Sequence, residues 1–226
     1  MEVLEESLLR KTLEKFKELK FATVFGSHIK RKHDEFSDLD IFIVCKDKKD
    51  KNLINNELSK LDIRITQEIH TNIFTSDEIE RRLRGNDYLL GSILEDSIFL
   101  FGEKDCFFEA KQRILTSKPN ENSMKFNRDM GTKILSYTDD LFRRFQNFSE
   151  SSAYEKRESY LLRREFFLMG IKNYHLGLGY LLASIQMKKL NKTISLRHLL
   201  SEDNSLLKNL IWIEKRIRRN VKQYVM

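Results

Sequence analysis

The chain has 226 residues, of which 40% are hydrophobic and 33% are charged, and its net charge at neutral pH is +7. This size and composition are typical of a soluble globular protein with one large domain or two small ones. No apolar run approaches the roughly 18 residues of a membrane-spanning helix, and the acidic N-terminus lacks the positive charge of a signal peptide. The two cysteines, Cys45 and Cys106, form neither a metal-binding pattern nor a disulfide framework. The sequence therefore favours a cytoplasmic protein without a membrane partner.

The first 103 residues predict alternating helices and strands. Apolar residues recur at helical spacing over residues 4–19, which indicates an amphipathic helix. Apolar runs at 21–25 and 39–44 and an alternating run at 68–74 indicate three strands. Helices are expected at 52–64, at 77–84 with Ser76 as N-cap, and at 88–95. A short strand at 97–101 is expected before Gly102.

The rest of the chain predicts helices only. They are expected at 106–115, 122–148, 153–190 and 206–224, with a short piece at 196–200, and this is the pattern of an up-down bundle. Gly170, Gly177 and Gly179 lower the helix propensity of the third helix, so we expect a close helix approach or a local break there. The predicted fold class is α+β, with a small mixed-sheet domain at 1–103 followed by an all-α up-down bundle at 104–226.

The charge is unevenly spread between these two halves. Residues 1–103 have a net charge of −4, whereas residues 104–226 have +11. A basic bundle could face nucleic acid or another polyanion, but Lys- and Arg-rich helical surfaces are also common without such a partner. Nucleic acid is therefore a partner that the sequence allows without favouring it.

The most informative stretch joins the first two strands. Gly26 and Ser27 follow the first strand, and Asp38 and Asp40 form an Asp-x-Asp motif that opens the second. Side chains two apart on a strand lie on the same face, so the two aspartates project together about 6.6 Å apart. The residues between and after them, Leu39, Ile41 and Ile43, then face the core. Two carboxylates at this spacing can share divalent metal, and a Gly-Ser turn can hold phosphate.

This arrangement resembles the nucleotidyltransferase superfamily that includes DNA polymerase beta, kanamycin nucleotidyltransferase and the small "minimal" nucleotidyltransferases. The pattern of that family is Gly-Ser, a short gap, and then Asp-x-Asp on a strand, which Gly26, Ser27, Asp38 and Asp40 match. The resemblance covers roughly residues 20–103. It implies an enzyme that moves a nucleoside monophosphate from a nucleoside triphosphate, with ATP as the expected donor, to a hydroxyl acceptor. It also implies that Asp38 and Asp40 hold Mg²⁺ or Mn²⁺.

The basic loop after the Gly-Ser turn adds candidate nucleotide-binding residues. It carries His28, Lys30 and Arg31. The resemblance places this loop beside the triphosphate, where positive groups would neutralise phosphate charge. A solvated basic loop without a ligand explains the same residues equally well.

The third strand departs from the family pattern. The family places a third carboxylate there, as base for the attacking hydroxyl and as a metal ligand. In this chain the matching position is His70, with Glu68 two residues earlier on the same strand face. Either residue could assist catalysis beside Asp38 and Asp40, and either could be an ordinary strand residue. A catalytically impaired nucleotide-binding or partner-binding module, antitoxin-like in character, is therefore the alternative function.

The predicted bundle also resembles architectures of this superfamily. Kanamycin nucleotidyltransferase carries substrate-side helices, and small nucleotidyltransferases are elsewhere paired with a helical partner called HEPN. The Arg-to-His signature of toxic HEPN ribonucleases is absent before His175 and His198, so a ribonuclease is not expected. The acceptor stays open between a small molecule, a protein side chain and an RNA end. A homodimer through the bundle is one arrangement that this organisation allows.

Overall fold

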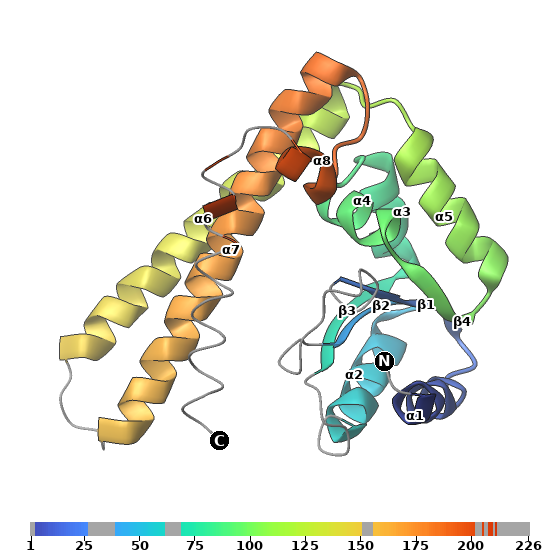
Figure 1. The fold of residues 1–226 in the computed structure, drawn as a ribbon, viewed down its shortest axis with the longest axis horizontal. Coiled ribbons are helices and arrows are strands. Elements are labelled where there is room, and N and C mark those ends of the chain that lie inside the picture. Colours follow the sequence, from blue (N-terminus) through green and yellow to red (C-terminus); the bar gives the residue numbers. More distant parts are fainter. Residues whose placement is uncertain are drawn as a thin grey trace. The chain divides into compact units, whose positions relative to one another are not determined.

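A computed structural model describes residues 3–26, 39–61, 69–150 and 156–201, together with a few positions between 205 and 211. The chain divides into two compact units, residues 1–117 and 118–226. The first unit contains a four-stranded sheet with helices on both faces, and the described part of the second unit is built from helices (Figure 1). The fold class is therefore α+β, as the sequence predicts.

The sheet of the first unit is mixed. Its strands are β1 (Leu19–Phe25), β2 (Leu39–Cys45), β3 (Ile69–Thr75) and β4 (Ile98–Gly102), in the spatial order β3-β2-β1-β4. β1 pairs antiparallel with both β2 and β4, whereas β2 and β3 run parallel. The start of β2 therefore lies between the end of β1 and the start of β3.

One face of the sheet is covered by the first two helices, α1 (Val3–Leu13) and α2 (Lys48–Leu61). Leu39, Ile41 and Ile43 of β2 are all buried on this face, which confirms their predicted orientation. α1 is shorter than the expected helix at 4–19. The chain turns after Leu13, and Leu19 already belongs to β1.

The opposite face of the sheet is aromatic. Phe21, Phe42 and Phe74 come from three neighbouring strands and pack edge to face, with ring centroids 5.2–6.0 Å apart. Such edge-to-face pairs stabilise a core beyond the area that they bury. Three helices cover this face: α3 (Ser76–Arg84), α4 (Tyr88–Glu95) and α5 (Lys104–Thr116).

Because α5 packs on the sheet, the boundary between the two units lies later in the chain than expected. Phe107, Ala110 and Ile114 of α5 are buried in the aromatic cluster of the sheet. We expected this helix to be the first of the bundle, with the boundary at 103/104. The division into compact units falls instead after Ser117, because the apolar stripe of α5 packs on the sheet.

α3 begins with a charged cap. Thr75 is the N-cap: its hydroxyl accepts a hydrogen bond from the Glu78 N–H at 3.2 Å, and the Glu78 carboxylate accepts one from the Thr75 N–H at 2.9 Å. This is a capping box. The prediction of Ser76 as N-cap was wrong by one residue, since Ser76 is already helical and its hydroxyl donates to the Cys45 carbonyl. The ammonium of Lys51 lies 3.1 Å from the Glu78 carboxylate.

A buried ion pair fixes the turn between α3 and α4. The Asp87 side chain is fully buried and accepts a hydrogen bond from Arg82 Nη1 at 2.7 Å. It also accepts one from the Leu90 N–H, which caps α4. The Arg82 guanidinium stacks on the ring of Phe74, 4.4 Å from its centroid. The turn is thereby joined to the aromatic face of the sheet.

The two cysteines have different environments. Cys45 is fully buried at the end of β2, and burial raises the pKa of its thiol to about 11. Cys106 lies on α5, is partly exposed and donates a hydrogen bond to the Glu103 carboxylate at 3.1 Å. Both thiols are free, as the sequence predicts.

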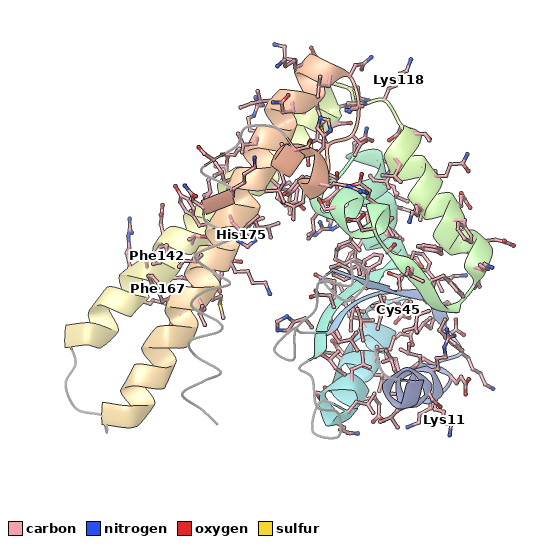
Figure 2. All side chains as sticks on the ribbon, viewed as in Figure 1. Lys11, Cys45, Lys118, Phe142, Phe167 and His175 are labelled. Carbon is pink, nitrogen blue, oxygen red and sulfur yellow. The ribbon has the colours of Figure 1, made fainter. Side chains whose placement is uncertain are left out.

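The second unit is built on a long helical hairpin. Its described helices are α6 (Glu121–Glu150), α7 (Lys156–Leu190) and α8 (Leu196–Ser201), and α6 packs along α7. A Cβ on Gly131 of α6 would lie 2.8 Å from the backbone oxygen of Gly177 on α7. Farther along, Gly170 faces the ring of Phe142, which also contacts Phe167 (Figure 2). α7 is continuous at all three of its glycines, Gly170, Gly177 and Gly179, so the close helix approach is confirmed and the local break is not found.

The predicted helix at 206–224 lies outside the described residues except for a few positions. Within the part of the chain that the structure describes, no helix is long and apolar enough to cross a membrane.

Candidate active site

Asp40 lies on β2, between the neighbouring strands β1 and β3. This residue is the second of β2, and in the sheet it pairs with Phe25 at the end of β1 and with His70 near the start of β3. Its sequence neighbours Leu39 and Ile41 are buried against α1 and α2, so Asp40 faces the aromatic side of the sheet. The Asp40 side chain is 29% exposed, whereas every other residue of β2 is buried. The strand thus presents a single accessible carboxylate, at its beginning.

Gly26 lies directly against this carboxylate. It follows Phe25 with φ +82°, a left-handed conformation that favours glycine. A Cβ at this position would lie 2.3 Å from Oδ2 of Asp40, far inside van der Waals contact. Two separate features therefore favour glycine here: the backbone conformation, and the space taken by a carboxylate that would have to move to admit a Cβ.

His70 lies on the other side of Asp40. The parallel register pairs the two residues, and Nδ1 of His70 is 3.9 Å from Oδ1 of Asp40. This distance is an ion-pair contact if the imidazole is protonated, and it is too long for a direct hydrogen bond. The His70 side chain is 26% exposed, so the imidazole and the carboxylate share a partly solvated edge of the sheet.

The structure brings together three of the residues that the sequence singles out. Gly26, Asp40 and His70 surround one point at the start of β2. The remaining candidates lie outside the described residues: Ser27, His28, Lys30, Arg31, Asp38 and Glu68. Their roles stay predictions.

Phe25 is a neighbour of the site that the sequence analysis treated only as a strand residue. It is partly buried on the aromatic face and pairs with Asp40 across the two central strands. Its place depends on the antiparallel register of β1 and β2. In the sequence, the only signal for Phe25 as a neighbour of the site is its position directly before the Gly-Ser turn.

Asp40 and His70 provide some of the ligand atoms that a divalent cation would need. An accessible carboxylate is a preferred ligand of Mg²⁺ and Mn²⁺, and an imidazole beside it suits Mn²⁺ better than Mg²⁺. Among the described residues, no three His, Cys, Asp or Glu side chains converge to form a complete metal site. Asp40 therefore fits as one ligand, and the predicted second ligand, Asp38, precedes it by two residues.

Residues 8–104 match the family model described as "Polymerase beta, Nucleotidyltransferase". This region of the chain is a nucleotidyltransferase domain of the polymerase beta family. The matched segment contains the whole sheet together with Gly26, Asp40 and His70, and it ends at the start of α5. The expected family of the first domain is thus confirmed.

Solved structures with weaker likeness accompany this match. They include a toxin–antitoxin with AMP-PNP (15% identity, 61% of this chain and 98% of that chain, TM-score 0.36). Another is a tri-AMPylated Shewanella oneidensis HEPN toxin in complex with MNT antitoxin (13%, 63% and 99%, 0.33). A third is spectinomycin adenyltransferase AAD(9) from Enterococcus faecialis with ATP and spectinomycin (15%, 81% and 96%, 0.36). A comparison with curated proteins finds no match.

Proposed function

We propose that this chain is a metal-dependent nucleotidyltransferase that moves a nucleoside monophosphate from a nucleoside triphosphate, ATP first among them, to a hydroxyl acceptor. The observation that carries the proposal is the contact between Gly26 and Asp40 inside a domain of the polymerase beta family. A left-handed glycine at the end of one strand lies against an accessible carboxylate at the start of the next. Phosphate can approach a backbone without side chains, and the carboxylate stands beside it.

Each residue of the motif has a role in this proposal. Gly26 and Ser27 would bind the β- and γ-phosphates, and His28, Lys30 and Arg31 would offset their charge. Asp38 and Asp40 would hold Mg²⁺ or Mn²⁺, which when bound polarises the phosphates and lowers the pKa of the attacking hydroxyl. The acceptor oxygen forms a bond to the α-phosphorus while the bond from the α-phosphorus to the bridging oxygen breaks. Pyrophosphate leaves with the electron pair, and the hydroxyl proton passes to a base.

His70 and Glu68 are the candidates for that base. His70 stands next to Asp40 in the parallel register, and its imidazole could accept a proton from an acceptor bound at the edge of the sheet. The same observation favours a second candidate function. Because the residue that faces Asp40 on β3 is a histidine and not a carboxylate, the chain could bind nucleotide without turning it over. It would then act as a binding module, for example an antitoxin-like one.

The first experiment tests the site through Asp40. Addition of ATP with Mg²⁺ should raise the melting temperature of the wild-type chain, as any ligand of the native state does. Asp40→Asn, alone and with Asp38→Asn, should abolish this shift and the release of pyrophosphate. The control is Asp105→Asn, the same chemical change on an exposed residue of α5, which should leave both unchanged. An undiminished shift in the double variant would refute the assignment.

The second experiment separates the enzyme from the binding module. Glu68→Gln and His70→Ala should each keep the thermal shift, and the one that removes the base should lose pyrophosphate release. If the wild-type chain shows the shift but releases no pyrophosphate with any small-molecule, protein or RNA acceptor, the binding module is the function. Release that persists in both variants would mean that neither residue is the base.

A further inference from the structure

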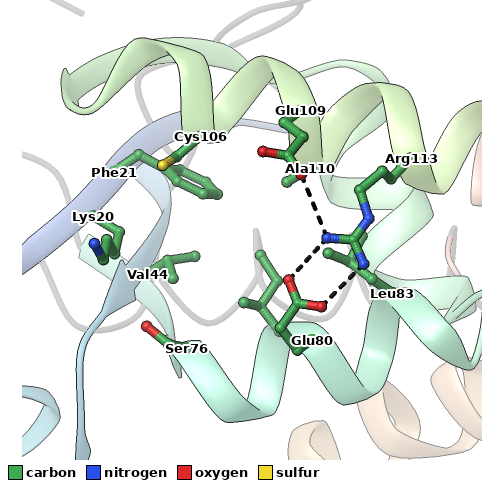
Figure 3. A pocket seen from close by; sticks show the side chains of 11 residues that line it. Lys20, Phe21, Val44, Ser76, Glu80, Leu83, Cys106, Glu109, Ala110 and Arg113 are labelled. Atoms are coloured by element: carbon green, nitrogen blue, oxygen red, sulfur yellow. Dashed lines mark hydrogen bonds and ion pairs between the residues drawn. The ribbon is translucent and has the colours of Figure 1, made fainter.

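A cleft opens between α3 and α5 on the aromatic side of the sheet (Figure 3). Its floor is apolar and is formed by residues that are almost fully buried, among them Phe21 and Val44 of the sheet, Ile79 and Leu83 of α3, and Ala110 of α5. Ala110 is the smallest side chain of this floor. Because α5 presents only a methyl group at this point, the two helices do not close the space between them.

The cleft has the size of a small organic molecule. Its volume is about 160 Å³. Folded proteins contain few internal spaces larger than a water molecule, and an apolar cavity of about 150 Å³ is large enough to bind benzene. A single aromatic ring or a branched aliphatic group of similar size therefore fits here. Unlike a closed cavity, the cleft is open to solvent on one side, so such a ligand can carry a polar group at the mouth.

The charges at one end of the mouth favour a positive group. The Arg113 guanidinium of α5 binds both carboxylate oxygens of Glu80 on α3, at 2.9 and 3.0 Å. Glu109 lies one turn before Arg113 and is 3.7 Å from it, beyond hydrogen-bond length, with 69% of its side chain exposed (Figure 3). An anionic ligand would have to displace Glu80 from Arg113. A cationic ligand can bind Glu109 and leave that pair intact.

At the other end of the mouth, the charged side chains are also paired with one another. The Lys20 ammonium lies 3.3 Å from one oxygen of Glu103, and the Cys106 thiol donates a hydrogen bond to the other oxygen at 3.1 Å. The Ser76 hydroxyl donates to the backbone at Cys45. Lys20 is thus already bound to a carboxylate. An anion gains little at this end as well.

The cleft is separate from the candidate active site. Val44, which lines the cleft, and Asp40 lie on the same strand four residues apart, which corresponds to about 13 Å along β2. Gly26, Asp40 and His70 are not among the residues that line it. A ligand in the cleft would therefore not occupy the position of a nucleotide bound at the start of β2.

We propose that the cleft between α3 and α5 is a binding site for a small cationic molecule, an amine that carries one aromatic ring or a branched aliphatic group. The apolar part lies on Phe21, Val44, Ile79, Leu83 and Ala110, and the positive group lies at Glu109. The site does not depend on the proposed transferase function.

Three probes of equal ring size test this site on the full chain: benzylamine, which is positive at neutral pH, toluene, which is neutral, and benzoate, which is negative. Calorimetric titration should show that benzylamine binds about two- to fivefold more tightly than toluene, the gain of a solvent-exposed ion pair. Benzoate should bind more weakly than toluene. Glu109→Gln should make benzylamine and toluene equal without loss of toluene binding. No binding of any probe, or tightest binding of benzoate, would overturn the proposal.

Two leucine substitutions on α5, one inside the cleft and one outside it, test whether binding needs the space of the cleft. Ala110→Leu places a larger side chain on the floor and should abolish binding of benzylamine and toluene. Gln112→Leu introduces the same residue two positions along α5 on its exposed side and should leave binding unchanged. Amide chemical shifts of the wild-type chain give a measurement that does not depend on the folding of a variant. Benzylamine should shift the amides of Ile79, Leu83 and Ala110 and not that of Asp40. Shifts centred on Asp40, or binding that survives in Ala110→Leu, would refute the site.

Discussion

Glycine serves two different purposes in the two units of this protein. In the first unit, Gly26 makes room for a side chain, the carboxylate of Asp40, and does so in a left-handed backbone conformation. In the second unit, Gly131 and Gly177 make room for each other's helix, and both keep ordinary helical conformations. The missing Cβ is the same, but it leaves space for an accessible carboxylate in one unit and sets the distance between two helices in the other. Substitution at the first site should therefore affect activity, and substitution at the second should affect stability.

The largest effect is expected at Gly26. Gly26→Ala would put a methyl group 2.3 Å from Oδ2 of Asp40, and the carboxylate would have to move. Displacement of a reacting group by about 1 Å can cost on the order of 100-fold in rate. Pyrophosphate release from ATP with Mg²⁺ should fall by that order, and the nucleotide-induced rise in melting temperature should be lost.

A second substitution at this position separates the two constraints on Gly26. Asn adopts positive φ more readily than most residues, so Gly26→Asn relieves much of the backbone strain but keeps the Cβ. It should be as inactive as Gly26→Ala while unfolding at a higher temperature. If Gly26→Asn recovers activity, backbone strain and not the contact with Asp40 explains the need for glycine.

An intermediate effect is expected in the helical hairpin. Gly131→Ala meets the backbone oxygen of Gly177 at 2.8 Å, which cannot move without displacing a helix, and should destabilise the chain by about 1–3 kcal/mol. Gly170→Ala meets a ring atom of Phe142 at 2.9 Å, which a rotation of the side chain can relieve. It also gains up to about 1 kcal/mol of helix propensity, so its stability should stay near that of the wild-type chain.

Urea unfolding measures this difference, and pyrophosphate release should be unchanged in folded Gly131→Ala. Equal stabilities of the two variants would mean that α6 and α7 can separate freely. A transfer rate lowered as strongly as in Gly26→Ala would remove the contrast between the two kinds of glycine.

The smallest effect is expected at the charged cap of α3. Burial alone would raise the pKa of Glu78, but hydrogen bonds from Thr75 and Lys51 outweigh it and hold that pKa below its ordinary value. A lowered carboxyl pKa stabilises the folded chain above the ordinary pKa, and this stabilisation is lost as pH falls through the lowered one. Glu78→Gln keeps the capping geometry and removes the charge. It should cost about 0.5 kcal/mol at pH 7.

Urea unfolding at neutral and acidic pH checks the prediction for Glu78. The difference between Glu78→Gln and the wild-type chain should be constant above the ordinary carboxyl pKa and should disappear at lower pH, where the wild-type carboxyl is also neutral. A difference that grows as the pH falls would contradict the sign of the shift. Transfer activity should not respond, because the cap lies at the opposite end of β3 from His70.

Local patterns in the sequence were sufficient for most elements of the first unit. The alternation of Leu39, Ile41 and Ile43 identified both β2 and its buried face, because a strand repeats every two residues. The range of α4 agrees with its prediction, whereas β1, β2, β4 and α3 differ from theirs by one or two residues at their ends. Thr75 rather than Ser76 caps α3, since either hydroxyl could accept the hydrogen bond and only the path of the chain selects one.

Long-range contacts could not be predicted in the same way. The stripe of Phe107, Ala110 and Ile114 on α5 is equally suited to a bundle and to a sheet, so its partner was not evident from spacing. The pairing of Asp40 with Phe25 and His70 depends on strand register, and the cleft beside Ala110 depends on how closely two helices approach. For the candidate site, the motif indicated Gly26 and Asp40. It did not indicate that the carboxylate of Asp40 takes up the space that a side chain at position 26 would need.

Because the two thiols are unequally buried, one of them can be labelled selectively on the native chain. Cys45 is inaccessible, and its raised pKa keeps the thiolate, the reactive form, scarce at neutral pH. Cys106 is partly exposed and lines the cleft between α3 and α5. Its hydrogen bond to Glu103 raises the pKa of its thiol too, so mildly alkaline conditions favour its reaction. A maleimide dye would then attach at a single place on the native chain, and its fluorescence would follow occupancy of the cleft without any engineered cysteine.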